Sequence, residues 1–290
     1  KRTLTLAQFK QEKRNSRQFY LSQRGIIIMA IHPTAIIDEG AEIHHTAHIG
    51  PYCIIGPQAR IGANTKLTSH VNVQNRTTLG ENNTVFPFAS LGTVPQDLKF
   101  DGEPSRLQIG NNNTIRESVT MNIGTQDGTM ETKVGNNCLF MAYSHVAHDC
   151  ELGDQVILAN SVGLAGHVSL GDKVIVGGLA GIHQFCRVGT MAFVAAGAMV
   201  AQDVLPFCVV QGDRGRHVSI NRIGLQRQGL SKTAITQLTS AFKMLFHSGK
   251  TRALALDSIQ MTFDDPHVET FLTFIKSSSR SICSSRRNQG

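Results

Sequence analysis

A six-residue hydrophobic repeat is the feature that most constrains how this chain folds. From Ile31 to Leu91 every sixth residue is aliphatic, and the same register resumes at Val134 and runs to Val200, with Phe140 as its one aromatic member. A fixed period of six residues is typical of a hexapeptide β-helix, in which three repeats complete one triangular coil. Residues one coil apart then lie above one another, separated by about 4.8 Å along the axis. We therefore predict an all-β, left-handed parallel β-helix over residues 30–213.

The composition favours a narrow coil. Aromatic residues make up only 6% of the chain, tryptophan is absent and 27 residues are glycine, so a core must be filled by small branched side chains. Glycine often follows the repeated aliphatic residue, as in Ile49-Gly50 and Ile61-Gly62. We interpret these glycines as tight corners, because glycine adopts backbone conformations that other residues avoid.

Two polar, turn-rich segments interrupt the repeat, at residues 92–108 and 122–133. We expect both to project from the coil as loops. Long loops in a compact domain often carry function.

The six-residue period ends near residue 213. A small α-helical C-terminal domain is expected over residues 214–276, where apolar residues follow helical spacing and Ser231 is suited to cap a helix. Residues 277–290, which are rich in serine, are expected to form a disordered tail.

Charge is segregated along the chain. Residues 1–29 carry seven Lys/Arg and one acid, residues 30–214 carry ten Lys/Arg and sixteen Asp/Glu, and residues 215–290 carry eleven Lys/Arg and four acids. A basic end on an acidic body indicates an anionic partner, for which a phosphorylated small molecule or an acidic protein fits best. Without a nucleic-acid-binding motif or interleaved aromatic residues, we expect no nucleic acid partner.

Residues 1–29 form a basic leader that resembles an organelle transit peptide. We expect a mitochondrial location, with the bacterial cytoplasm or a plastid as alternatives, and a basic arm of no targeting role remains open. No run of consecutive apolar residues approaches the ~20 that cross a bilayer, so we expect no membrane-spanning segment. The six cysteines show neither CxxC pairs nor zinc-ligand spacing, which favours reduced, buried thiols.

Four of the twelve histidines fall in the second run of repeats. One coil of three repeats has 18 residues, so Gly166 should lie directly above His148, and Gln184 directly above Gly166. The segments that contain His145, His167 and His183 should therefore share one corner of three successive coils. Convergence of titratable groups at one place is characteristic of a functional site.

These residues suggest acyl transfer. His148, with Asp149 beside it to fix its tautomer, is suited to take a proton from a hydroxyl. Gly166 leaves space above His148 and exposes a backbone N–H that can hold an oxyanion. Since no Ser or Cys stands in a nucleophile motif, direct transfer is favoured over a covalent intermediate. Two alternatives stay open: a zinc-dependent lyase of the γ-carbonic-anhydrase type, which needs three histidines, or a non-catalytic scaffold trimer.

A set of motifs also resembles a known family. In order and spacing, the chain is similar over about residues 30–275 to the UDP-N-acetylglucosamine O-acyltransferases of lipid A biosynthesis, and the leader suggests an organelle-targeted, plant-like version. The matching segments are IHPTAIID, HIGPYCIIGP, QDLKFDGEPSR, IRESVT, HVAHDC, LAGHV, HQFC, VAQDV and SGKT. A related N-acyltransferase of that pathway would carry an additional N-terminal domain, for which residues 1–29 are too short.

The resemblance implies a homotrimer that moves an (R)-3-hydroxyacyl group from acyl carrier protein to the 3-hydroxyl of UDP-N-acetylglucosamine. The acyl donor is carried on phosphopantetheine, and no cofactor or metal is expected to be bound. His148 resembles the general base, Asp149 its partner and Gly166 the oxyanion donor. Substrate-contacting positions match Gln96, Asp97, Lys99, His145, His167, His183, Gln184, Asn221 and Arg227.

Three positions bear on specificity. Ile223 stands where the family has a glutamate, and Gln228 replaces a basic residue, so the nucleotide contacts should differ in detail. Ala196 resembles the position that limits acyl-chain length, where glycine would permit a longer chain. We expect a medium-length acyl group.

Overall fold

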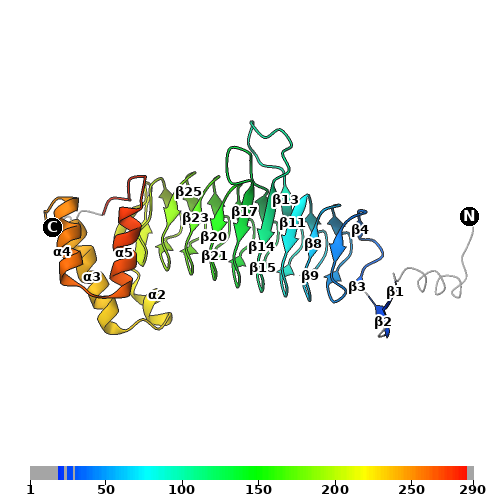
Figure 1. Cartoon of the computed structure of the whole chain (residues 1–290), viewed down its shortest axis with the longest axis horizontal. Coiled ribbons are helices and arrows are strands. Elements are labelled where there is room, and N and C mark those ends of the chain that lie inside the picture. The colour runs from blue at the N-terminus through cyan, green and yellow to red at the C-terminus, as the bar shows by residue number, and fades with distance from the viewer. Residues whose placement is uncertain (1–18, 23–24, 29, 286–290) are drawn as a thin grey trace, which may run out of the picture.

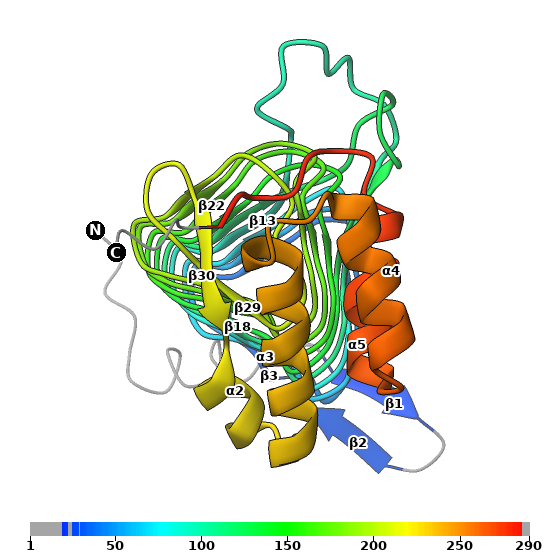
Figure 2. The ribbon, with the colours of Figure 1, turned by 90° about the vertical axis from the view of Figure 1, so that its left-hand side faces the viewer.

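The chain forms an elongated triangular prism with helices at its C-terminal end (Figure 1). The computed structural model describes residues 19–22, 25–28 and 30–285. Viewed along the axis, the coils superpose as a triangle and α3 and α5 lie across its end (Figure 2). The prism is a left-handed parallel β-helix, so the predicted fold class is confirmed.

Three parallel sheets form the faces of the prism. Face I contains β3 (Ala30–Ile31), β6 (His48–Ile49), β9 (Lys66–Leu67), β12 (Thr84–Val85), β15 (Thr114–Ile115), β18 (Leu139–Phe140), β21 (Ile157–Leu158), β24 (Ile175–Val176), β27 (Phe193–Val194), β29 (Cys208–Gln211) and the antiparallel β30 (Arg216–Ile220). Face II contains β4 (Ile36–Ile37), β7 (Ile54–Ile55), β10 (Asn72–Val73), β13 (Ser90–Thr93), β16 (Thr120–Asn122), β19 (His145–Val146), β22 (Gly163–Leu164), β25 (Gly181–Ile182) and β28 (Met199–Val200). Face III contains β5 (Glu42–Ile43), β8 (Arg60–Ile61), β11 (Arg76–Leu79), β14 (Arg106–Ile109), β17 (Glu131–Val134), β20 (Glu151–Leu152), β23 (Ser169–Leu170) and β26 (Arg187–Val188).

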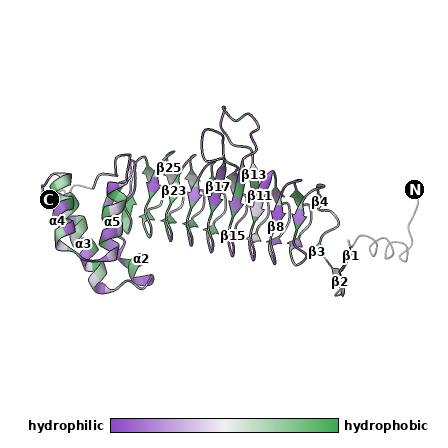
Figure 3. Ribbon diagram, in the orientation of Figure 1, coloured by the Kyte–Doolittle hydropathy of each residue, from purple (hydrophilic) through white to green (hydrophobic). Residues whose placement is uncertain are grey.

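The repeated aliphatic residues fill the interior of the prism. In the two-residue strands the second side chain is buried in the interior and the first is more exposed. Figure 3 colours the strands by hydropathy, and hydrophilic and hydrophobic residues alternate along the prism. Leu158, Leu164 and Val176 are fully buried, and burial of such a side chain contributes roughly 1.5–3 kcal/mol. All six cysteines are buried and unpaired.

The glycines that follow the aliphatic residues serve a different purpose from the one expected. The corner backbone turns through a left-handed conformation two residues later, at non-glycine positions such as Tyr52, with φ 58°, and Asn64, with φ 57°. An added Cβ at Gly50 or Gly62 would instead collide with the backbone of the next coil. These glycines are needed for close stacking of the coils, so the interpretation as tight corners was wrong.

Both insertions leave the coil at the corner between faces II and III, here called the II–III corner. They span residues 94–105, between β13 and β14, and residues 123–130, between β16 and β17, and they project together from one edge of the prism (Figures 1 and 2). They are shorter than the intervals 92–108 and 122–133 because their ends pair with neighbouring coils.

The C-terminal domain packs against the last coil. Its helices are α2 (Arg222–Arg227), α3 (Lys232–His247), α4 (Arg252–Thr262) and α5 (Pro266–Lys276). Ser231 caps α3, since its side chain accepts a hydrogen bond from the Ala234 N–H at 3.1 Å. The helices begin later than residue 214, because residues 216–220 extend face I as β30.

The segment 277–285 is ordered, which corrects the expected disorder from residue 277. The Cys283 N–H donates to the Asp203 carbonyl at 2.8 Å, the Ser278 hydroxyl donates to the Asp203 carboxylate, and Ile282 and Cys283 are buried. Serine-rich composition misled the prediction because these hydroxyl and backbone groups find partners on the last coil. Residues 286–290 lie outside the described residues.

The predicted basic leader falls mostly on residues that the structure does not describe, namely 1–18, 23–24 and 29. Within it, β1 (Phe19–Ser22) and β2 (Gly25–Ile28) form an antiparallel pair. Among the described residues, every helix is too short or too polar to cross a bilayer.

His217 links the last strand to the C-terminal segment. The ring is fully buried, accepts a hydrogen bond from the Leu205 N–H at 3.0 Å and donates from Nδ1 to the Cys283 carbonyl at 2.8 Å. Burial lowers the pKa of His217 from 6.5 to about 4. The folded protein therefore holds this imidazole neutral.

We predict that acid destabilises the fold through His217. The unfolded chain binds a proton at this residue below pH 6.5 whereas the folded chain binds it only near pH 4, so stability is complete above 6.5 and falls by about 3 kcal/mol as the pH drops through this interval. Urea unfolding at several pH values measures the slope. Glutamine does not titrate, so His217→Gln should lose this pH dependence of the unfolding free energy. His45→Gln, which replaces an exposed histidine, should keep it. An unchanged slope in His217→Gln would contradict this assignment.

Candidate active site

Coil stacking brings the histidine-containing segments together at the II–III corner. His145, Gly163 and Gly181 are in register on adjacent strands of face II. The turns that follow these strands carry His148, Gly166 and Gln184 respectively. Three segments separated by one coil each therefore form one continuous wall.

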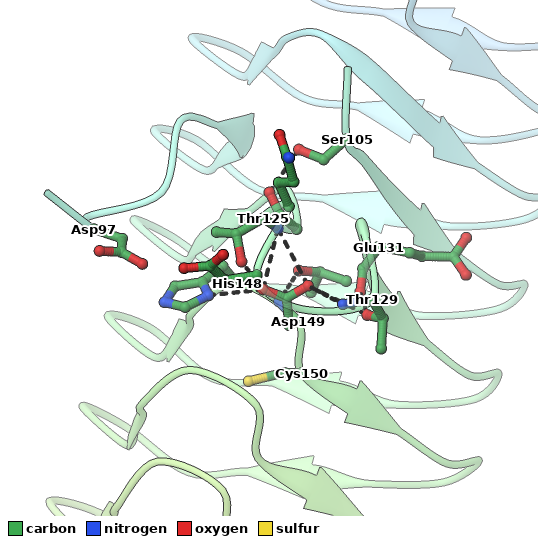
Figure 4. Close-up of polar contacts among 12 residues, drawn as sticks. Asp97, Ser105, Thr125, Thr129, Glu131, His148, Asp149 and Cys150 are labelled. Carbon is green, nitrogen blue, oxygen red and sulfur yellow. Dashed lines mark hydrogen bonds and ion pairs between the residues drawn. The ribbon is translucent and has the colours of Figure 1, made fainter. Parts of the chain in front are cut away.

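His148 and Asp149 form a hydrogen-bonded pair at this corner (Figure 4). The His148 Nδ1 lies 2.8 Å from Asp149 Oδ2. The His148 side chain is 15% exposed and that of Asp149 is fully buried. Because a carboxylate only accepts, Nδ1 carries a proton, so the neutral form of the ring has its lone pair on Nε2. The imidazole is thus prepared to accept a proton at Nε2.

The Asp149 carboxylate is held by the second insertion. It accepts hydrogen bonds from the Thr125 hydroxyl at 2.6 Å and the Thr129 N–H at 2.8 Å, in addition to His148. Burial raises the pKa of Asp149, but the hydrogen bonds from Thr125 and His148 outweigh it and leave the pKa below its usual value. Asp149 is therefore ionised at neutral pH despite its burial.

Gly166 leaves the space in which the His148 ring lies. A Cβ at this position would meet His148 Cε1 and Nε2 at 2.6 Å. Among the hydrogen bonds of the described residues, the Gly166 N–H has no acceptor. A free backbone donor beside this imidazole can stabilise an oxyanion that forms there.

The other histidines surround His148. His167 lies with its ring centroid 5.0 Å away, edge to face, and stacks on Phe185 at 4.3 Å. The Nδ1 of His145 lies 2.7 Å from the Thr120 hydroxyl. Burial lowers the pKa of both His145 and His167, so both rings are neutral at pH 7.

A cleft of about 690 Å³ opens on this wall. Its lining includes six of the predicted site residues, and the outward positions Gly163, Gly181 and Met199 of face II lie along it. Those six are Gln96, His145, His148, Gly166, His183 and Gln184. A second groove of similar volume, about 690 Å³, follows face III, but no histidine lines it.

Asp97 and Lys99 lie on the first insertion beside this cleft. Asp97 Oδ1 accepts a hydrogen bond from the Lys99 N–H at 3.0 Å, and Lys99 Nζ approaches Asp127 of the second insertion at 3.5 Å. Figure 4 shows Asp97 beyond the edge of the His148 ring. Neither side chain lines the cleft within this chain.

Three predicted residues lie elsewhere. Asn221 caps α2 and donates from Nδ2 to the Met191 carbonyl at 3.0 Å, while Arg227 is exposed in the last turn of that helix. Ala196 is exposed at the corner between faces I and II, after β27. Within one chain, the structure does not bring these residues to the cleft.

No side chain lining the cleft can act as a serine or cysteine nucleophile, since none of these residues is Ser or Cys. Ser144 is fully buried inside the coil. Burial also raises the pKa of Cys150 to about 12, so that thiol stays protonated. The arrangement therefore favours proton abstraction by His148 without a covalent intermediate.

Sequence reasoning missed the residues that support the site. Thr125 and Thr129 fix Asp149, Thr120 contacts His145, and Met199 and Arg214 line the cleft. The insertion 122–133 was expected to be functional as a whole. No spacing signal marks its two threonines, because their partners lie in the next coil.

The fold and the site together define a hexapeptide-repeat transferase. The sequence profile described as bacterial transferase hexapeptide (six repeats) matches residues 131–166, and the profile described as UDP N-acetylglucosamine O-acyltransferase, domain 2, matches residues 203–283.

Solved structures give the family. The chain is 45% identical to LpxA from Acinetobacter baumannii, with 88% of this chain and 99% of that chain covered and a TM-score of 0.85. It is 42% identical to UDP-N-acetylglucosamine O-acyltransferase (LpxA) from Moraxella catarrhalis, with 88% and 99% covered and a TM-score of 0.85. It is 31% identical to the Arabidopsis UDP-N-acetylglucosamine acyltransferase, with 88% and 100% covered and a TM-score of 0.77. The chain belongs to the UDP-N-acetylglucosamine O-acyltransferase (LpxA) family.

We predict that Gly166→Ala displaces the His148 ring, because the added methyl group would lie 2.6 Å from Nε2. The imidazole nitrogen and carbon resonances of His148 should shift in NMR spectra of ring-labelled protein. Gly163→Ala is the matched control, since an added Cβ there meets nothing within 4 Å. Equal spectra for both variants would show that Gly166 does not hold open the space for the ring.

Proposed function

We propose that the chain transfers an (R)-3-hydroxyacyl group from acyl carrier protein to the 3-hydroxyl of UDP-N-acetylglucosamine, the first step of lipid A biosynthesis. One observation carries the proposal: an imidazole, oriented through Nδ1 by a buried carboxylate, faces a cleft of about 690 Å³. Family membership supports both the reaction and the substrates.

His148 acts as the general base in this mechanism. Its Nε2 takes the proton of the sugar hydroxyl as the hydroxyl oxygen attacks the thioester carbonyl carbon. Asp149, ionised and hydrogen-bonded to Nδ1, stabilises the imidazolium that forms. Collapse of the tetrahedral intermediate breaks the carbon–sulfur bond, and the departing thiolate takes the proton back from Nε2.

Gly166 supports the charge that develops on the carbonyl oxygen. Its N–H has no acceptor among the described residues, and the residue lies against the His148 ring, so both groups are placed to act on one tetrahedral centre. Gly163 and Gly181 occupy the outward positions of β22 and β25, and the room left by their missing side chains suits a linear acyl chain along the axis. The proposed reaction uses only residues of the protein and the two substrates. The phosphopantetheine that carries the acyl group is part of the acyl carrier protein.

The basic C-terminal domain suits the carrier protein. Lys232, Lys243, Lys250 and Arg252 are exposed on or beside α3 and α4, and residues 215–290 carry only four acids. A basic surface of this kind attracts an acidic partner and accelerates encounter. The mitochondrial location expected from the basic leader stays a prediction.

A homotrimer would cover an exposed apolar edge of the prism. Tyr52, Phe88, Tyr143 and Leu179 are 58–69% exposed along the corner between faces I and II, and His70 lies between the rings of Tyr52 and Phe88. Large exposed apolar groups in one strip mark an interaction surface. In such an assembly Asn221 and Arg227, which lie outside the cleft of their own chain, could serve the cleft of a neighbour.

We predict that His148→Ala lowers the rate of transfer by about 10²–10⁴-fold, because the general base is lost. The assay combines UDP-N-acetylglucosamine with 3-hydroxyacyl carrier protein and detects the product by mass spectrometry. Stability should change by about 1 kcal/mol or less, and His45→Ala, at an exposed histidine of the first coils, should keep full activity. A large loss of stability in His148→Ala would point to a structural histidine instead.

We predict that Ala196→Gly shifts the preference of the enzyme toward longer acyl chains, because a smaller residue leaves more room at the position that resembles the chain-length limit. Rates with donors of increasing chain length measure the preference. Ala195→Gly, one residue earlier, is the control. A preference that Ala196→Gly leaves unaltered would exclude this residue as the determinant.

A further inference from the structure

We propose that His148 and His167 form a binding site for a single zinc ion, and that zinc bound there inhibits acyl transfer. The inhibition rests on the proposed function, whereas the binding site stands on geometry alone. The site lies within one chain, so it does not depend on the assembly.

The donor atoms converge. His148, Asp149 and His167 each offer a ligand atom, and these atoms lie within 4.8 Å of one another. The two imidazole centroids are 5.0 Å apart. Two histidines that share one tetrahedral zinc ion at metal–nitrogen distances near 2.0–2.1 Å place their rings at about this separation.

Asp149 orients the site without having to bind the ion. Its carboxylate is fully buried and already accepts hydrogen bonds from Thr125, Thr129 and His148 Nδ1. A carboxylate hydrogen-bonded to the far nitrogen of a histidine is the usual second-shell partner of a zinc ligand. It fixes the tautomer that directs the His148 Nε2 lone pair outward and supplies a negative charge behind the ring.

His167 is positioned by ring contacts alone. Its ring stacks on Phe185 at 4.3 Å with an interplanar angle of 10°, and its nitrogens have no hydrogen-bond partner among the described residues. The missing side chain at Gly166 leaves His148 Nε2 open to the cleft. Water from the cleft can complete the coordination of the ion.

The two roles of His148 exclude each other. The nitrogen that would bind zinc is the one that must accept the proton of the sugar hydroxyl. Zinc should therefore compete with the nucleotide sugar. This is the opposite of a zinc lyase, which would require the ion, and His145 does not join the group of convergent ligands.

Calorimetric titration of the metal-free full chain with zinc chloride tests the site. Wild-type protein should bind one ion per protomer, and His167→Ala should bind it at least about tenfold more weakly. His183→Ala is the matched control, because it removes a histidine that lines the cleft with His148 but lies outside the ligand group, and its affinity should equal that of wild type. Equal affinity in His167→Ala and wild type, or an equal loss in His183→Ala, would overturn the site.

The same preparations test inhibition. Zinc should inhibit transfer by wild-type protein, a chelator should restore it, and a higher concentration of nucleotide sugar should relieve it. Binding without inhibition, or activation by zinc, would overturn the inhibitory role. A metal-free enzyme that never transfers the acyl group would contradict the proposed function instead, while the titration would still decide on the site.

Discussion

Backbone hydrogen bonding between successive coils is the interaction on which this structure depends. Each two-residue strand pairs in parallel with strands one coil before and after it, so a position on one coil is fixed relative to the same position on the next. Side chains at the same position of successive coils therefore meet whatever their identity, 18 residues apart where no insertion intervenes. The wall that carries His148, Gly166 and Gln184 is a direct product of this register, and the buried aliphatic residues keep it from slipping.

The insertions turn this regular wall into a chemical site. Both interrupt the II–III corner in the two coils before His148, and the second supplies the threonines that hold Asp149 ionised inside the protein. The segment 277–285 also contributes, because it returns to the last coil. There Arg280 donates a hydrogen bond to the carbonyl of Gln184, one of the residues that line the cleft, at 3.1 Å. A rigid scaffold thus carries a site whose supporting contacts come from segments that break the repeat.

The repeat predicted most of the fold because a period of six residues fixes both the strands and their stacking. The repeat also predicted that His148, Asp149 and Gly166 lie close together, because the position of a residue within the repeat determines which residues stack above it in the next coil. What it could not predict depends on contacts outside the register. Thr125 and Thr129 reach Asp149 from an insertion, Asn221 caps a helix, and Ser278 finds Asp203 although its composition suggests disorder.

The decisive observation is a crystal structure with UDP-N-acetylglucosamine bound. The mechanism requires the 3-hydroxyl oxygen within about 2.6–3.2 Å of His148 Nε2, with the Gly166 N–H directed at the adjoining space. A sugar bound along face III, or an imidazole of His148 turned away from the hydroxyl and sealed from the cleft, would contradict the assignment of this corner as the place of acyl transfer.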